Sequence, residues 1–126
     1  MEAIEKNEEI SEMDCAERLL AVGDALYAIG GKWKLRVIIA LANGFRRFND
    51  IQRKIPGISP RALSIELKEL EANGFLKRCV NAKATPVTVE YELTNYSHSL
   101  SEVVASLTKW GKMHREKLRQ DNKNAE

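Results

Sequence analysis

Apolar positions recur at helical spacing over the first half of the chain. Residues 15–29 carry apolar side chains three and four apart, which predicts a first helix that ends at Gly30 and Gly31. Residues 33–42 are apolar nearly all round, so the second predicted helix belongs in the core. Residues 48–54 predict a short third helix with an inward apolar face.

The fourth predicted helix, residues 59–73, has two contrasting faces. Ser59 is a favourable N-cap, and Pro60 suits the first helical position, where the backbone N–H that proline lacks would be unpaired anyway. One face carries the leucines Leu63, Leu67 and Leu70. At 100° per residue, the opposite face carries Arg61, Ser64, Ile65 and Lys68.

The spacing of apolar side chains changes after Gly74 and predicts a β-hairpin followed by a last helix. Residues 87–93 alternate apolar and polar side chains, as half-buried strands do, and residues 75–81 form the partner strand. We expect Thr94 to cap the last helix, whose apolar stripe consists of Leu100, Val103, Val104, Leu107, Gly111, His114 and Leu118. The predicted fold is therefore mainly α with a small β-hairpin, in the order of a winged helix-turn-helix.

Length and composition define the expected organisation. A chain of 126 residues fits one domain. We expect a flexible acidic segment at residues 1–14, the winged helix-turn-helix domain at residues 15–118 and a flexible tail at residues 119–126. The sequence has neither a long apolar run nor an apolar signal region after its acidic start, so we expect a cytoplasmic protein without a membrane partner.

Charge is distributed unevenly along the chain. The formal net charge is only +2. Residues 1–14 carry six acidic side chains and one lysine, whereas residues 32–83 carry twelve Lys or Arg and four Asp or Glu, a net charge of +8. A basic middle indicates a polyanionic partner, although a solvated charged surface explains the same counts.

The polar face of helix 59–73 suits double-stranded DNA. The second helix of a helix-turn-helix enters the major groove, where Arg or Lys reaches guanine O6 and N7 and an apolar group contacts a thymine methyl. Arg61 lies in the first turn, the end nearest the base edges, and Ile65 fits a thymine methyl. Lys68 suits a phosphate contact better than a base contact.

Each of these assignments has an alternative. Arg61 could pair with Glu66 or Asp50, or be a solvated charge. Ile65 could pack on a partner subunit or lie alone on the surface, as single apolar residues often do.

The hairpin adds a second basic surface. Lys77, Arg78 and Lys83 flank its loop and suit contacts to phosphates or the minor groove, with one of the three expected to be structural or idle. Lys32 and Lys34, at the start of the second helix, are further candidates for phosphate contacts. The predicted DNA-binding set consists of Ser59, Pro60, Arg61, Ser64, Ile65, Lys68, Lys77, Arg78 and Lys83.

Three segments together resemble the HxlR-type winged helix-turn-helix transcriptional regulators. They are IGGKWKL (29–35), RFNDIQRKIPGISPRALSIELKELEANGFLKR (47–78) and VEYELT (89–94), within a resemblance that covers residues 15–112. The resemblance implies a bacterial regulator that binds operator DNA as a homodimer built from its first and last helices. Arg61 falls on the arginine of the family's Ile-Ser-Pro-Arg motif, and Ile65 stands where a polar residue is usual.

Some members of this family sense oxidants or electrophiles through a cysteine just ahead of the first helix. Cys15 is the corresponding candidate for a redox sensor. It is followed by Ala16 and lies 14 residues before Ile29, whereas a Cys-Pro about nine residues before that isoleucine is usual in the family. Cys79 suits a small packing residue in the first strand. The sequence does not identify a small-molecule inducer.

Other chemistries lack a supporting pattern. His98 and His114 lie 16 residues apart without a further ligand at metal-binding spacing. No glycine-rich phosphate loop is present, and Ser59 lacks a His–Asp partner nearby in the sequence, so we expect neither an enzyme nor a cofactor. Trp33 and Trp110 are expected in the core. The alternative function is a winged-helix module that docks proteins, because the fold alone does not determine function.

Overall fold

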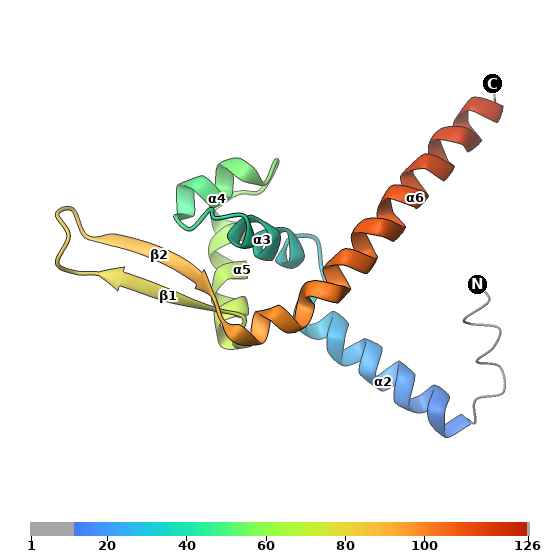
Figure 1. Ribbon diagram of the computed structural model, residues 1–126, viewed down its shortest axis with the longest axis horizontal. Helices are drawn as coiled ribbons and strands as arrows, with labels where there is room; N and C mark the ends of the chain where they lie inside the picture. Colours follow the sequence, from blue (N-terminus) through green and yellow to red (C-terminus); the bar gives the residue numbers. More distant parts are fainter. Residues whose placement is uncertain (1–11, 126) are drawn as a thin grey trace.

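The computed structural model describes residues 12–125, and its elements follow one another in the order of a winged helix-turn-helix (Figure 1). The elements are α2 (Glu12–Ile29), α3 (Lys34–Ala42), α4 (Phe48–Lys54), α5 (Pro60–Ala72), β1 (Leu76–Asn81), β2 (Thr88–Leu93), the 3₁₀ helix η2 (Asn95–Leu100) and α6 (Ser101–Ala125). The mainly α fold with a two-stranded antiparallel hairpin is confirmed. Of the segment 1–14 that was expected to be flexible, residues 1–11 lie outside the described residues, and residues 12–14 belong to α2.

The turn between α4 and α5 is built as the sequence predicts. Gly57 has a φ of +85°, a left-handed conformation that glycine adopts without the strain a Cβ would bring. Ser59 then caps α5, because its Oγ accepts a hydrogen bond of 3.0 Å from the backbone N–H of Ala62. Pro60 occupies the start of the helix. Turn and cap together fix where α5 begins relative to α4.

The hairpin is anchored to the helices at its base. Leu76 pairs with Leu93 at the inner end of the register, and the N–H of Thr94 donates to the carbonyl of Phe75 at 3.0 Å. The N–H of Tyr91 donates at 2.8 Å to the carbonyl of Arg46, in the segment between α3 and α4. The wing therefore leaves the domain from a fixed base while its loop extends away from the helices (Figure 1).

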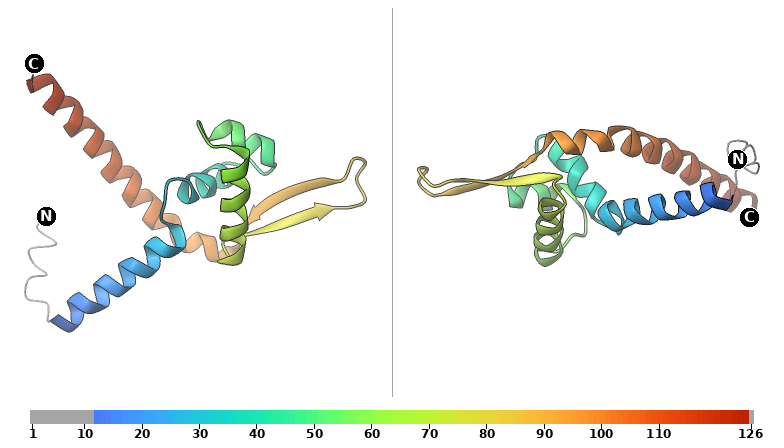
Figure 2. Two further views of the ribbon diagram at one scale, coloured as in Figure 1. Left: turned by 180° about the vertical axis from the view of Figure 1, so that it is seen from behind. Right: turned by 90° about the horizontal axis from the view of Figure 1, so that it is seen from below.

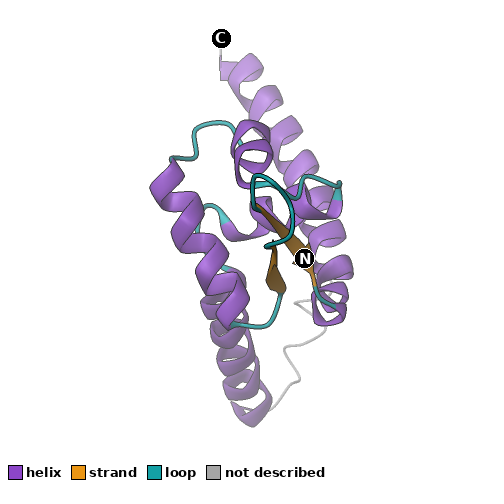
Figure 3. Cartoon of the chain, turned by 90° about the vertical axis from the view of Figure 1, so that its left-hand side faces the viewer, coloured by secondary structure: helices purple, strands orange, loops and turns teal. Residues whose placement is uncertain are grey.

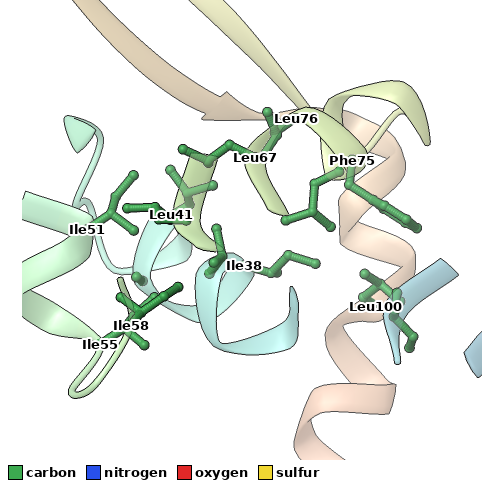
Figure 4. Packing of buried hydrophobic residues seen from close by; sticks show 14 residues of the cluster. Ile38, Leu41, Ile51, Ile55, Ile58, Leu67, Phe75, Leu76 and Leu100 are labelled. Carbon is green, nitrogen blue, oxygen red and sulfur yellow. The ribbon is translucent and has the colours of Figure 1, made fainter. Parts of the chain in front are cut away.

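One apolar core joins α3, α4, α5 and the base of the hairpin (Figure 4). Its fully buried side chains are Val37, Ile51, Leu63, Leu67, Leu70 and Leu76. Ile38, Ile55 and Leu100 are also buried in this cluster. Since α5 contributes all three of its leucines, the opposite face of that helix is left on the surface.

The first and last long helices extend away from this core. Both project from the side of the domain opposite the hairpin (Figures 1 and 2), which faces the viewer in Figure 3. The exposed large apolar side chains of α2 are Leu19, Leu20, Val22, Leu26 and Tyr27. Those of α6 are Val103, Leu107, Trp110, Met113 and Leu118.

The last helix differs from its prediction in three respects. Thr94 does not cap it through its side chain, because Oγ1 donates instead to the carbonyl of Gly74 at 2.6 Å and the next six residues form η2. Residues 119–125, expected as a flexible tail, continue α6 as a helix. Trp110 is not a core residue: it is 57% exposed, stacked on His114 with ring centroids 4.8 Å apart.

Within residues 12–125, no helix combines the length and apolar character that crossing a membrane requires.

Candidate nucleic-acid interface

The two faces of α5 are those that the leucine spacing predicts. Leu63, Leu67 and Leu70 are buried. Arg61 and Lys68 are exposed, Ser64 is half-buried, and Ile65 is 45% exposed. The structure thus brings Arg61, Ser64, Ile65 and Lys68 together on one outward surface of a single helix.

Arg61 is available for a ligand. The two acids that could have neutralised it have other partners, since Asp50 binds Arg53 and Glu66 accepts a hydrogen bond of 3.2 Å from Lys34. Within the described part of the chain, Arg61 forms no ion pair. Among residues 12–125, neither of the two acids that the sequence offers as partners therefore explains an arginine at this position.

The three wing cations differ in how they are held. Lys77 pairs with Glu92 at 3.6 Å across the strands. Arg78 and Lys83 have no ion pair among residues 12–125, and the backbone N–H of Lys83 donates to Oδ1 of Asn81 at 3.2 Å, which shapes the loop. The structure therefore leaves Arg78 and Lys83 as the free cations of the wing and gives Lys77 an internal partner.

Two arginines without a predicted role lie beside the second strand of the wing. Arg46 and Arg47 precede α4, and their guanidinium groups lie 4.0 Å from Glu92 and 3.8 Å from Glu90. Both pairs are exposed, so each contributes little to stability on its own. Both guanidinium groups nevertheless face acidic side chains of β2. Glu90 and Glu92, which alternate with apolar residues along that strand, are the sequence signal that could have predicted a basic partner.

Lys34 corrects one prediction of the sequence analysis. It was a candidate for a phosphate contact, but its side chain lies inside the domain, where Nζ donates to Glu66 at 3.2 Å and to Glu69. The hydrogen bond to Glu69 is the main cause that raises the pKa of Lys34 above its usual 10.5. The stabilisation that this raised pKa represents is therefore complete at neutral pH and is lost as the pH rises through the higher pKa of the folded state.

Trp33 contacts two of the remaining cations of this region. Nζ of Lys32 lies 4.7 Å from the ring centroid, and the guanidinium carbon of Arg36 lies 5.6 Å from it. Arg36 also donates to the carbonyl of Lys32. The half-buried indole thus orders both cations by cation–π contacts while Lys32 stays exposed.

The two cysteines occupy different environments. Cys15 is an exposed thiol in the first turn of α2, and Cys79 is a half-buried thiol in β1, opposite Glu90. Among residues 12–125, no group of three or more His, Cys, Asp or Glu side chains is arranged to hold a metal ion.

Comparison with known proteins identifies the family. The family model described as HxlR-like helix-turn-helix matches residues 28–119. A relative from Methanothermobacter thermautotrophicus, an uncharacterised HTH-type transcriptional regulator, is 42% identical over 98 residues, which are 78% of this chain and 74% of the relative. YtcD of Bacillus subtilis, which carries the same description, is 38% identical over 75% of each chain.

Solved structures agree with the sequence matches. The reduced form of the redox regulator HypR superposes with a TM-score of 0.72 at 37% identity and covers 79% of this chain and 98% of its own. Diamide-treated YodB from B. subtilis gives a TM-score of 0.62 at 35% identity, over 72% of this chain and 89% of its own. The arrangement of α3 to β2 and these matches lead to one conclusion: the chain belongs to the HxlR-like helix-turn-helix family, whose members are transcriptional regulators and not enzymes.

Proposed function

We propose that this regulator binds a palindromic operator in double-stranded DNA as a homodimer, with α5 in the major groove and the wing on the backbone. The observation that carries the proposal is the outward face of α5, where Arg61 and Ile65 are exposed within the first two turns, and Arg61 has no ion pair among residues 12–125. Arginine and an apolar group at that end of a recognition helix match guanine and a thymine methyl. A DNA-binding regulator of this kind would act in the cytoplasm.

The predicted contact set divides into two classes. Arg61, Ser64 and Ile65 are positioned for base edges, while Lys68, Arg78 and Lys83 suit phosphates. Ser59 and Pro60 act chiefly by starting α5 at the right place. Lys77 contributes less than the other wing cations, because its ammonium group already has Glu92 as a partner.

The projecting helices α2 and α6 support the proposed homodimer. Ten large apolar side chains of these helices are exposed in the single chain, and apolar side chains gathered on two helices in this number favour an interface. A second copy would cover both helices by a two-fold arrangement, in which each contact occurs twice. Such a dimer would present two α5 helices to successive turns of a palindrome.

The alternative function is a module that docks a protein. An apolar or acidic outer face on α5 would favour it. The observed face and the free wing residues are cationic, with Arg61, Lys68, Arg78 and Lys83 exposed, and this favours DNA.

Replacing Arg61 tests the recognition helix. Arg61→Ala should weaken binding to the cognate operator by about 1–3 kcal/mol and relax the preference for one base pair, while the fold stays intact because the side chain is exposed. Mobility-shift titration with operator DNA measures the effect. Arg119→Ala, which removes the same charge near the far end of α6, is the matched control, and equal affinity of the two variants would contradict the assignment.

Replacing Lys83 tests the wing. If the side chain contacts a phosphate, Lys83→Ala should reduce the slope of log K against log salt by about 0.9 and weaken operator and random DNA alike. Titrations at several salt concentrations measure this slope, with Lys77→Ala as the comparison in which the ion pair to Glu92 predicts a smaller change. A slope unchanged in Lys83→Ala would show that this lysine is merely solvated.

Replacing Leu107 tests the dimer. Leu107 is half exposed in the single chain, so Leu107→Asp should leave the subunit folded, but a carboxylate buried between subunits is strongly unfavourable. Light scattering at micromolar concentration should give the dimer mass for wild type and the monomer mass for Leu107→Asp. Lys112→Asp, an exposed position on the side of α6 opposite this apolar stripe, should remain dimeric. A monomeric wild type that still binds a palindrome tightly and without cooperativity would refute the dimer.

Redox sensing by Cys15 is a further proposal, supported by the exposure of the thiol and by the names of HypR, a redox regulator, and of diamide-treated YodB. Diamide should change the operator affinity of wild type and of Cys79→Ser, but not of Cys15→Ser. Mass spectrometry would establish that Cys15 is modified. Unchanged DNA binding by the modified protein would rule the sensor out.

A further inference from the structure

Lys34 is the only buried charged side chain among residues 14–125. The residue is 9% exposed at the start of α3, directly after the break that separates α3 from α2. A buried ammonium is unfavourable unless it is paired and hydrogen-bonded. Its position inside the domain therefore requires partners, and both of them come from α5.

The two partners lie on one flank of the recognition helix. Lys34 Nζ donates to Oε1 of Glu66 at 3.2 Å and to Oε2 of Glu69. At 100° per residue, both glutamates lie between the buried leucine face and the outward face that carries Arg61. The carboxylate of Glu66 is largely buried, whereas the side chain of Glu69 is 51% exposed. One cation thus holds two successive turns of α5 against α3.

The ion pairs of Lys34 with Glu66 and Glu69, here called the clasp, give α5 a directional contact, which the leucines do not provide. Apolar packing is non-directional, so it tolerates small rolls of a helix about its axis. At the surface of a helix, about 5–6 Å from its axis, a roll of about 10° moves a side chain by about 1 Å. Hydrogen bonds to base edges span only about 2.7–3.2 Å, so such a roll separates a matched contact from a missed one.

We propose that Lys34 is a positioning residue for DNA recognition, which sets the roll of α5 by tying Glu66 and Glu69 to α3. The inference rests on the proposed function of α5 and deepens it. Lys34 itself touches no DNA in this account. Its effect appears in discrimination between sequences, because the roll determines how Arg61 and Ile65 meet the bases and leaves the wing contacts to the backbone unchanged.

Two simpler explanations must be separated from this one. The ammonium could serve only to neutralise two carboxylates that would otherwise repel DNA phosphates, or only to stabilise the fold. Removing Lys34 alone cannot distinguish them, since it leaves buried charge without a partner. The triple variant Lys34→Met with Glu66→Gln and Glu69→Gln removes the clasp without leaving an unpaired charge.

The readout is the ratio of the dissociation constants for random DNA and operator DNA, measured at one salt concentration on variants whose thermal unfolding shows that they are folded. We expect the triple variant to bind random DNA with an affinity at or above that of wild type, and its ratio to fall by roughly tenfold, the scale of one mismatched base pair. Glu69→Gln changes a half-exposed side chain, should fold in any case and should lower the ratio by a smaller factor.

The outcomes are distinct. A wild-type ratio in both variants would overturn the inference and leave operator binding intact, because the clasp would then only balance charge or stabilise the fold. A wild-type protein that does not prefer its operator to random DNA would overturn the proposed function and, with it, this inference.

Discussion

The burial of three leucines on α5 is the contact on which the recognition surface depends. Leu63, Leu67 and Leu70 pack into the core that α3 and α4 share, and helical geometry then places Arg61 and Ile65 outward. Loss of one such leucine side chain typically costs about 2–5 kcal/mol, so the leucine face of α5 is strongly held in the core. The same core anchors the base of the hairpin through Leu76, which gives the wing a fixed position relative to α5.

Polar contacts at the edges of the apolar core add to the positioning of α5 and the wing. Ser59 fixes the start of α5, Lys34 holds its flank, and Arg46 and Arg47 direct charge at β2. Most acids near the recognition surface are thereby engaged inside the subunit. Within the described residues, the cations without such partners, Arg61 and Lys83 among them, are therefore the charges that remain for a polyanion.

Much of this arrangement follows from the sequence because local rules and packing agree. The leucine spacing, the Ser59 cap and the glycine turn predict α5 within a residue of its observed bounds, and alternation predicts β2. The two faces of α5 were predicted for the same reason, since period and burial are linked.

The features that the sequence does not predict depend on contacts between distant parts of the chain. Lys34 looks like a surface lysine in sequence, because its partners lie 32 and 35 residues further on. Thr94 is a sound N-cap candidate, but the nearby carbonyl of Gly74 competes for its hydroxyl. Trp110 was expected in the core because aromatic residues usually are buried, and only the projection of α6 away from the domain shows otherwise.

Selection of DNA fragments from a random pool by the purified protein, followed by sequencing, is the decisive test of operator recognition by α5. We expect enrichment of an inverted repeat whose half-sites are centred about one helical turn apart, about 10–10.5 base pairs, or a multiple of it. Each half-site should contain a guanine within reach of Arg61. Recovery of fragments with no common sequence, or of a single half-site without a repeat, would contradict this expectation.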